Sequence, residues 1–160
     1  MINITIAAVG RIKEKFYTEA IGEYSKRLKR YCKLNIVEVK DEPTPDNPSD
    51  REREIVLNGE GKRLLEKIPK SAYVVALCIE GKNMPSERFA EFIQNNAAEG
   101  KGEIVFVIGG SMGICEEIKK RADFKLSFSE MTFPHQLMRV ILLEQIYRAF
   151  NIASGGKYHK

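Results

Sequence analysis

Runs of β-branched and apolar residues alternate along the chain with segments whose apolar residues recur at helical spacing. A short apolar run predicts a buried strand, and helical spacing predicts an amphipathic helix. The predicted strands are Ile2 to Val9, Leu34 to Val39, Ala72 to Ile79, Glu103 to Ile108 and Phe124 to Phe128. The predicted helices are Phe16 to Tyr31, Asp50 to Lys67, Ser86 to Ala98, Ile114 to Arg121 and Pro134 to Ala153. This alternation indicates an α/β fold, with a mostly parallel sheet of about five strands flanked by helices.

Two of the predicted strands end in segments that suit a ligand site. Gly109-Gly-Ser-Met-Gly113 follows one strand and precedes a helix, and a polar loop after Phe128 runs to the proline that opens the last helix. Glycine permits a tight turn and a close approach of backbone to a ligand. Because open α/β sheets bind ligands beyond the carboxyl ends of their strands, we expect a crevice formed within residues 104–135.

The last predicted helix, 134–153, is apolar around most of its circumference. A helix of this kind is buried on two sides. One side can face the sheet, and we expect the other to meet a second copy of the chain in a homodimer. The alternative is a helix enclosed by the sheet and loops of one chain. Its charged residues Arg139, Glu144 and Arg148 then lie at or beside a buried surface, where they need partners or serve a site.

Composition changes this picture only a little. The length of 160 residues predicts a single domain, 1–160, and the net charge of +4 permits a nucleic-acid partner without requiring one. The basic residues between Lys26 and Lys33 suit either a helix C-terminus or a surface that meets phosphates. Three cysteines without C-x-x-C spacing predict reduced, buried thiols in a cytoplasmic protein. We expect neither a signal peptide nor a membrane-spanning segment.

A serine hydrolase is the alternative from a different class. The segment around Ser111 fits the G-x-S-x-G nucleophile elbow, and Asp123 and either His135 or His159 follow in the order Ser, Asp, His. Two features weaken this hypothesis. The chain has no H-G-G-G segment to complete an oxyanion hole, and His135 is predicted in the first turn of a helix.

The two histidines and the chain terminus allow few other chemistries. His135 and His159 have no clustered cysteine or carboxylate partners in the sequence, so no metal site is predicted. The tail Tyr158-His159-Lys160 is either a solvated end or a group that stacks on a base, exchanges a proton and holds a phosphate.

Several segments together resemble the RlmH family, the small SPOUT-class methyltransferases of bacteria that modify ribosomal RNA, and the resemblance covers the whole chain. The residues that carry it are Ile108-Gly109-Gly110, Leu126-Ser-Phe-Ser-Glu-Met-Thr-Phe-Pro-His135, Arg139-Val140, Glu144-Gln-Ile-Tyr-Arg-Ala149 and Tyr158-His159. The combination of S-x-x-T-x-P-H, L-x-E-Q-x-Y-R-A and a Y-H ending is highly specific. One departure is Lys160, where some relatives carry arginine, because lysine keeps the charge but lacks the bidentate fork.

The resemblance implies an activity and an assembly. The activity is the transfer of a methyl group from S-adenosylmethionine to N3 of the pseudouridine at position 1915 of 23S rRNA. The substrate would be the rRNA within the large subunit or the whole ribosome. The assembly is a homodimer with a trefoil knot near the C-terminus. The cofactor-binding residues implied are Leu77, Gly109, Phe128, Ser129, Glu130, Met131, Thr132 and Phe133.

The catalytic residues that we infer are His159, Tyr158 and Arg139. His159 is a candidate base or base-orienting group, and Arg139 a candidate for stabilising the N3 anion. Tyr158 and His159 would complete a composite site across the dimer. A third hypothesis, besides the methyltransferase and the hydrolase, is that the chain forms a basic dimer that binds ribosomes without catalysis.

Overall fold

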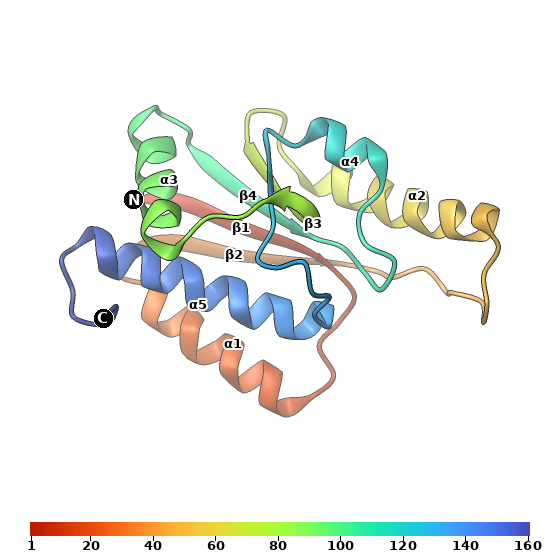
Figure 1. The fold of residues 1–160 in the computed structure, drawn as a ribbon, viewed down its shortest axis with the longest axis horizontal. Coiled ribbons are helices and arrows are strands. Elements are labelled where there is room, and N and C mark those ends of the chain that lie inside the picture. The colour runs from red at the N-terminus through yellow and green to blue at the C-terminus, as the bar shows by residue number, and fades with distance from the viewer.

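The computed structural model describes residues 1–160, and it contains a five-stranded parallel sheet with helices on both faces (Figure 1). The strands are β1 (Ile2–Val9), β2 (Cys32–Val39), β3 (Tyr73–Lys82), β4 (Glu103–Ile108) and β5 (Phe124–Leu126). Their order in the sheet is β2-β1-β4-β3-β5, and every neighbouring pair is parallel. The predicted α/β fold with a parallel sheet is therefore confirmed.

The helices divide between the two faces of the sheet. They are α1 (Lys15–Leu28), α2 (Asp50–Lys67), α3 (Ser86–Ala98), α4 (Glu116–Arg121) and α5 (His135–Ala153). Helices α1, α3 and α5 cover one face, and α2 and α4 cover the other (Figure 1). Alternate residues of each strand separate into two cores: Ile4 and Ile6 of β1 face the three-helix side, while Ala7 and Val9 face α2 and α4.

Helix α5 lies between α1 and α3 and packs on the sheet with Leu142, Leu143 and Ile146, which are fully buried. Other apolar residues of the helix are only half-buried, namely Leu137, Met138, Val140, Ile141 and Ile152. Neighbours within the chain thus cover a large part of the helix, and the homodimer stays a prediction.

The end of the sheet differs from the sequence prediction, because β5 stops at Leu126 and β3 continues to Lys82. The reason is a register shift between Leu77 and Lys82, after which the β3 chain crosses close to β5. Gly81 permits the crossing, since a Cβ there would lie 2.8 Å from backbone atoms of Lys125 and Leu126. Phe128, predicted at the end of a strand, therefore belongs to a loop.

Helix α2 carries charge over most of its surface and begins with the predicted capping box. The Ser49 hydroxyl accepts a hydrogen bond from the Glu52 N–H, and the Glu52 carboxylate accepts one from the Ser49 N–H, both at 3.1 Å. The cysteines are unpaired. Cys32 and Cys115 are buried as predicted, whereas Cys78 is only half-buried. None of the helices is long and apolar enough to traverse a bilayer.

Candidate active site

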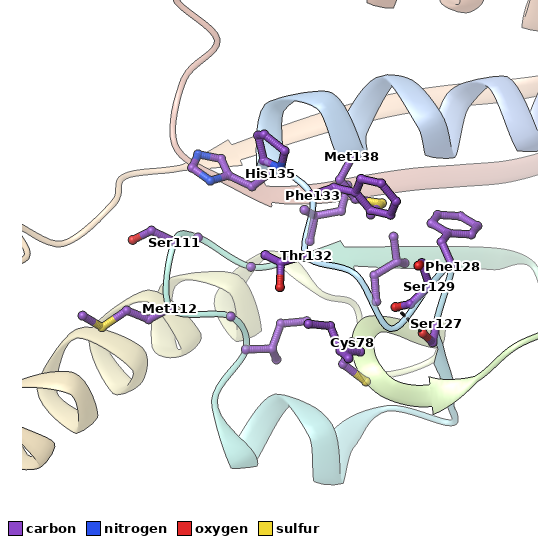
Figure 2. A pocket seen from close by; sticks show the side chains of 18 of the residues that line it. Cys78, Ser111, Met112, Ser127, Phe128, Ser129, Thr132, Phe133, His135 and Met138 are labelled. Carbon is purple, nitrogen blue, oxygen red and sulfur yellow. Dashed lines mark hydrogen bonds between the residues drawn. The ribbon is translucent and has the colours of Figure 1, made fainter.

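A cavity of about 790 Å³ opens at the carboxyl ends of β3, β4 and β5. It is lined by residues 77–80, 108–114, 126–129 and 131–136, with Lys119 and Met138. Figure 2 shows these segments converging from the ends of different strands and from the start of α5. The crevice predicted within 104–135 is therefore present, and the end of β3 forms an additional wall.

The glycine segment after β4 forms a tight turn whose backbone lines the cavity. The Gly113 N–H donates to the Gly110 carbonyl at 3.0 Å, and Gly113 has a φ of +87°, which favours glycine. A Cβ on Gly109 would lie 2.2 Å from the Gly113 carbonyl oxygen and 2.9 Å from Ile114 Cγ1. Any side chain at Gly109 therefore forces the turn to move.

The loop after β5 is held by its own serines. The Ser127 hydroxyl donates to the Ser129 carbonyl at 3.1 Å, and the Ser129 hydroxyl accepts from the Met131 N–H at 3.0 Å (Figure 2). The Asn83 side chain also donates to the Ser127 carbonyl at 2.9 Å, which ties the loop to the end of β3. These hydrogen bonds give the loop a defined shape.

The walls of the cavity combine apolar side chains with backbone polar groups. Leu77, Ile108, Phe128 and Met138 supply apolar surface, and the glycine turn supplies exposed backbone. A pocket of this kind suits a small molecule with a flat ring and a few polar groups.

The cavity brings together nearly all the residues that the resemblance assigns to the cofactor. Leu77, Gly109, Phe128, Ser129, Met131, Thr132 and Phe133 line it, whereas Glu130 does not. Their role in binding stays a prediction. Sequence reasoning missed the residues that follow Leu77, together with Lys119 and Met138. Lys119 forms an ion pair with Glu80, and this hydrogen bond raises the pKa of Lys119 and lowers that of Glu80.

The predicted catalytic residues do not reach this cavity within one chain. Arg139 is 2% exposed, donates to Glu38 at 2.5 Å and to the Gly10 carbonyl at 3.2 Å, and is not part of the lining. Tyr158 and His159 lie against the other end of α5, where they contact Glu144 and Arg148. His135 lines the cavity, and Arg148 is about 20 Å from it along the helix.

The residues of the hydrolase hypothesis are also separated. Ser111 lies at the rim of the cavity and makes no hydrogen bond to either histidine. Asp123 lies at the amino-terminal end of β5, away from the carboxyl ends where the cavity opens. Its carboxylate accepts a hydrogen bond from the Val74 N–H at 2.8 Å and pairs with Arg121. His135 begins α5, and burial, followed by the charge of Arg139, lowers its pKa. No serine triad is assembled.

Glu60 of α2 is a buried carboxylate directly behind the glycine turn. It is 5% exposed, one oxygen accepts from the Glu42 N–H at 3.0 Å, and the other has no hydrogen-bond partner. A Cβ on Gly110 would lie 3.0 Å from this second oxygen. Burial raises the pKa of Glu60, the nearby Asp41 and Glu42 charges raise it further, and the Glu42 N–H and Arg63 oppose the rise.

We predict that Glu60→Gln stabilises the chain at neutral pH. A raised pKa in the folded state means that Glu60 favours folding below its ordinary pKa of 4.5 and disfavours it as the pH rises and the buried group ionises. Glutamine keeps an acceptor for the Glu42 N–H without a charge. We expect a gain of about 1 kcal/mol at pH 7, a rise in Tm of about 3 °C.

Thermal unfolding between pH 4.5 and pH 8 measures this effect. The gain in Tm of Glu60→Gln should shrink toward pH 4.5. Glu66→Gln changes an exposed residue of the same helix and should show no gain in Tm. Parallel stability curves for Glu60→Gln and the wild type would show that the buried carboxyl does not titrate as described.

Comparisons with known proteins point to one family. A family model described as predicted SPOUT methyltransferase matches residues 2–159. The ribosomal RNA large subunit methyltransferase H of Clostridium kluyveri is 58% identical over 159 residues, which cover 99% of this chain and 100% of that protein. The protein of the same name from Clostridium novyi (strain NT) is 56% identical over the same shares of both chains.

A solved structure shares the fold. It is a probable methylase family protein from Haemophilus influenzae Rd KW20, with a TM-score of 0.53 and 13% identity. The match covers 99% of this chain and 70% of that one. At this identity the likeness concerns the fold alone.

Proposed function

Because the chain belongs to the SPOUT methyltransferase family, we propose that it transfers a methyl group from S-adenosylmethionine to N3 of pseudouridine 1915 in 23S rRNA. The observation that carries this proposal is the cavity at the strand ends, because residues far apart in the sequence that the resemblance assigns to the cofactor meet there. Relatives of more than half identity are named methyltransferases of large-subunit rRNA, which supports the substrate class.

The residues of the cavity fit S-adenosylmethionine. The cavity volume of about 790 Å³ lies within the range of small-molecule sites. Leu77, Ile108 and Phe128 can enclose the adenine ring, and backbone groups of the glycine turn and of loop 127–133 can read its polar edge. Because a Cβ on Gly109 would clash with the Gly113 carbonyl, the turn has no side chain at this position, and the space beside it stays open.

The protein contributes mainly positioning to the reaction. When bound, S-adenosylmethionine would supply an electrophilic methyl group for pseudouridine N3, with the sulfur keeping the bonding electrons and the N3 proton passing to solvent. Arg139 stays a predicted stabiliser of the N3 anion. Its guanidinium is directed at Glu38 and the Gly10 carbonyl, so contact with a base requires that pairing to break.

A homodimer explains how Tyr158 and His159 can act. Their own cavity is at the far end of α5, so the tail of one chain would serve the cavity of its partner. Val140 and Ile141 of α5 are apolar and only half-buried within one chain, and this supports the packing of a second copy against α5. We propose that the substrate is the large subunit or the whole ribosome in the cytoplasm. We also propose that residues 1–160 form a single domain. The trefoil knot stays an expectation from the resemblance.

Calorimetric titration with S-adenosylhomocysteine tests the cofactor assignment. We expect saturable binding with one site per chain, and no comparable heat from adenosine monophosphate, which lacks the amino-acid end. Absence of binding, together with labelling of Ser111 by a serine-directed phosphonate, would favour the hydrolase. Ribosome binding without either signal would favour a non-catalytic dimer.

A further inference from the structure

The C-terminal tail folds back on its own helix in a defined conformation. The Tyr158 N–H donates to the Asn151 side chain at 3.1 Å, and the Tyr158 hydroxyl donates to Glu144 at 3.0 Å. The Tyr158 ring meets the Tyr147 ring edge-on, with 5.0 Å between centroids. A Cβ on Gly156 would lie 2.3 Å from the Asn151 side-chain oxygen. The tail is therefore a built element rather than a free end.

His159 is held from both sides by charged groups of its own chain. Its Nδ1 lies 3.1 Å from Arg148 Nη1, and its Nε2 lies 2.7 Å from a carboxylate oxygen of Glu87, at the start of α3. Glu87 and His159 are brought together although 72 residues separate them in the sequence.

The chemistry of these partners selects one form of the ring. An arginine side chain only donates hydrogen bonds, so Nδ1 of His159 must accept. A carboxylate only accepts, so Nε2 must carry the proton and donate to Glu87. A doubly protonated ring would instead turn an N–H toward the Arg148 guanidinium.

Arg148 cannot easily turn away from the ring, because Glu144 holds it. Its Nη2 donates to Glu144 at 2.7 Å and its Nε at 3.2 Å, and its guanidinium carbon lies 4.7 Å from the Tyr158 ring centroid. The donor facing His159 therefore has a fixed direction. The charged groups around the imidazole are Glu87 on α3 and, on α5, Arg148 with Glu144 behind it.

We propose that Glu87 is a positioning residue for His159: together with Arg148 it fixes the imidazole as the Nε2–H tautomer and fixes the plane of the ring. This inference rests on the proposed function only in placing the tail in the reaction. Both ring nitrogens are occupied, so in this arrangement His159 does not accept the N3 proton. A ring whose plane is fixed in this way would contribute by stacking on a base.

Ring ¹⁵N NMR of the free protein tests the tautomer without any substrate. The chain has two histidines, so the ring signals that disappear in the His159→Asn variant are those of His159. In the wild type we expect the His159 shifts of a neutral ring protonated at Nε2. In Glu87→Leu the shifts should move toward those of a free imidazole. Glu91→Leu, one turn further along α3 and paired only with Arg88, should leave them unchanged. Unchanged shifts in Glu87→Leu, or an Nδ1–H ring in the wild type, would overturn the proposal.

Methylation kinetics on ribosomes test the consequence for the reaction. We expect Glu87→Leu to lower kcat about tenfold, with affinity for S-adenosylhomocysteine unchanged, because the loss is one charge-assisted hydrogen bond. Glu87→Gln should recover most of the rate, since its side-chain oxygen still accepts from Nε2. A loss confined to KM, or equal losses in the Leu and Gln variants, would contradict positioning through this bond. If the wild type methylates nothing, the proposed function fails and the NMR result still decides the tautomer.

Discussion

Replacing Gly109 by alanine should abolish measurable binding of S-adenosylhomocysteine. The new Cβ would lie 2.2 Å from the Gly113 carbonyl oxygen and 2.5 Å from its carbon, and backbone atoms cannot move aside as a side chain can. The turn would shift into the space assigned to the cofactor. We expect affinity to fall at least about 100-fold, which corresponds to about 2.8 kcal/mol.

Calorimetry on matched variants measures this loss. Gly102→Ala precedes the same strand, β4, and its Cβ meets nothing within 4 Å, so it should bind as the wild type does. Because Gly109→Ala can also lower stability, Leu77→Trp provides a second variant that fills the cavity by side-chain bulk alone. Wild-type affinity in both variants would exclude this cavity as the cofactor site.

His159→Ala should lower methyl transfer to ribosomes about 100-fold while leaving the affinity for S-adenosylhomocysteine unchanged. The separation follows from position, because the tail lies at the far end of α5 from its own cavity. Because Glu87 and Arg148 bind the His159 ring, its removal also loosens the tail, and this contributes to the lower rate of methyl transfer.

Single-turnover methylation, with cofactor binding measured in parallel, separates the two effects. Lys157→Ala changes an exposed residue of the same tail, one that donates no hydrogen bond and forms no ion pair, and it controls for general disturbance of the terminus. Wild-type activity of His159→Ala would remove His159 from the reaction.

The elements of this fold follow from local patterns, and most of them could be predicted. Continuous apolar runs such as 104–108 indicate strands buried on both faces, and the Ser49–Glu52 capping box marks the start of α2. The carboxyl ends of parallel strands meet at one edge, so the glycine turn and the loop after β5 could be placed together.

The remaining features depend on contacts between distant residues, which local patterns do not encode. The strand order β2-β1-β4-β3-β5 and the crossing at Gly81 arise from pairing across the sheet. Helix α2 shows only a thin apolar stripe, yet it buries Glu60 behind the glycine turn. The Glu87–His159 contact likewise joins two charged or polar residues that no periodicity connects.

Mixed dimers test the composite site most directly. A Gly109→Ala chain has a defective cavity and an intact tail, and a His159→Ala chain has the reverse. Co-expressed with different affinity tags and purified through both, the mixed dimer would contain one intact cavity facing one intact tail. We predict that both homodimers are nearly inactive and that the mixed dimer methylates at about half the wild-type rate. A mixed dimer as inactive as its parents would show that each tail serves its own chain, and would contradict a site completed by the partner.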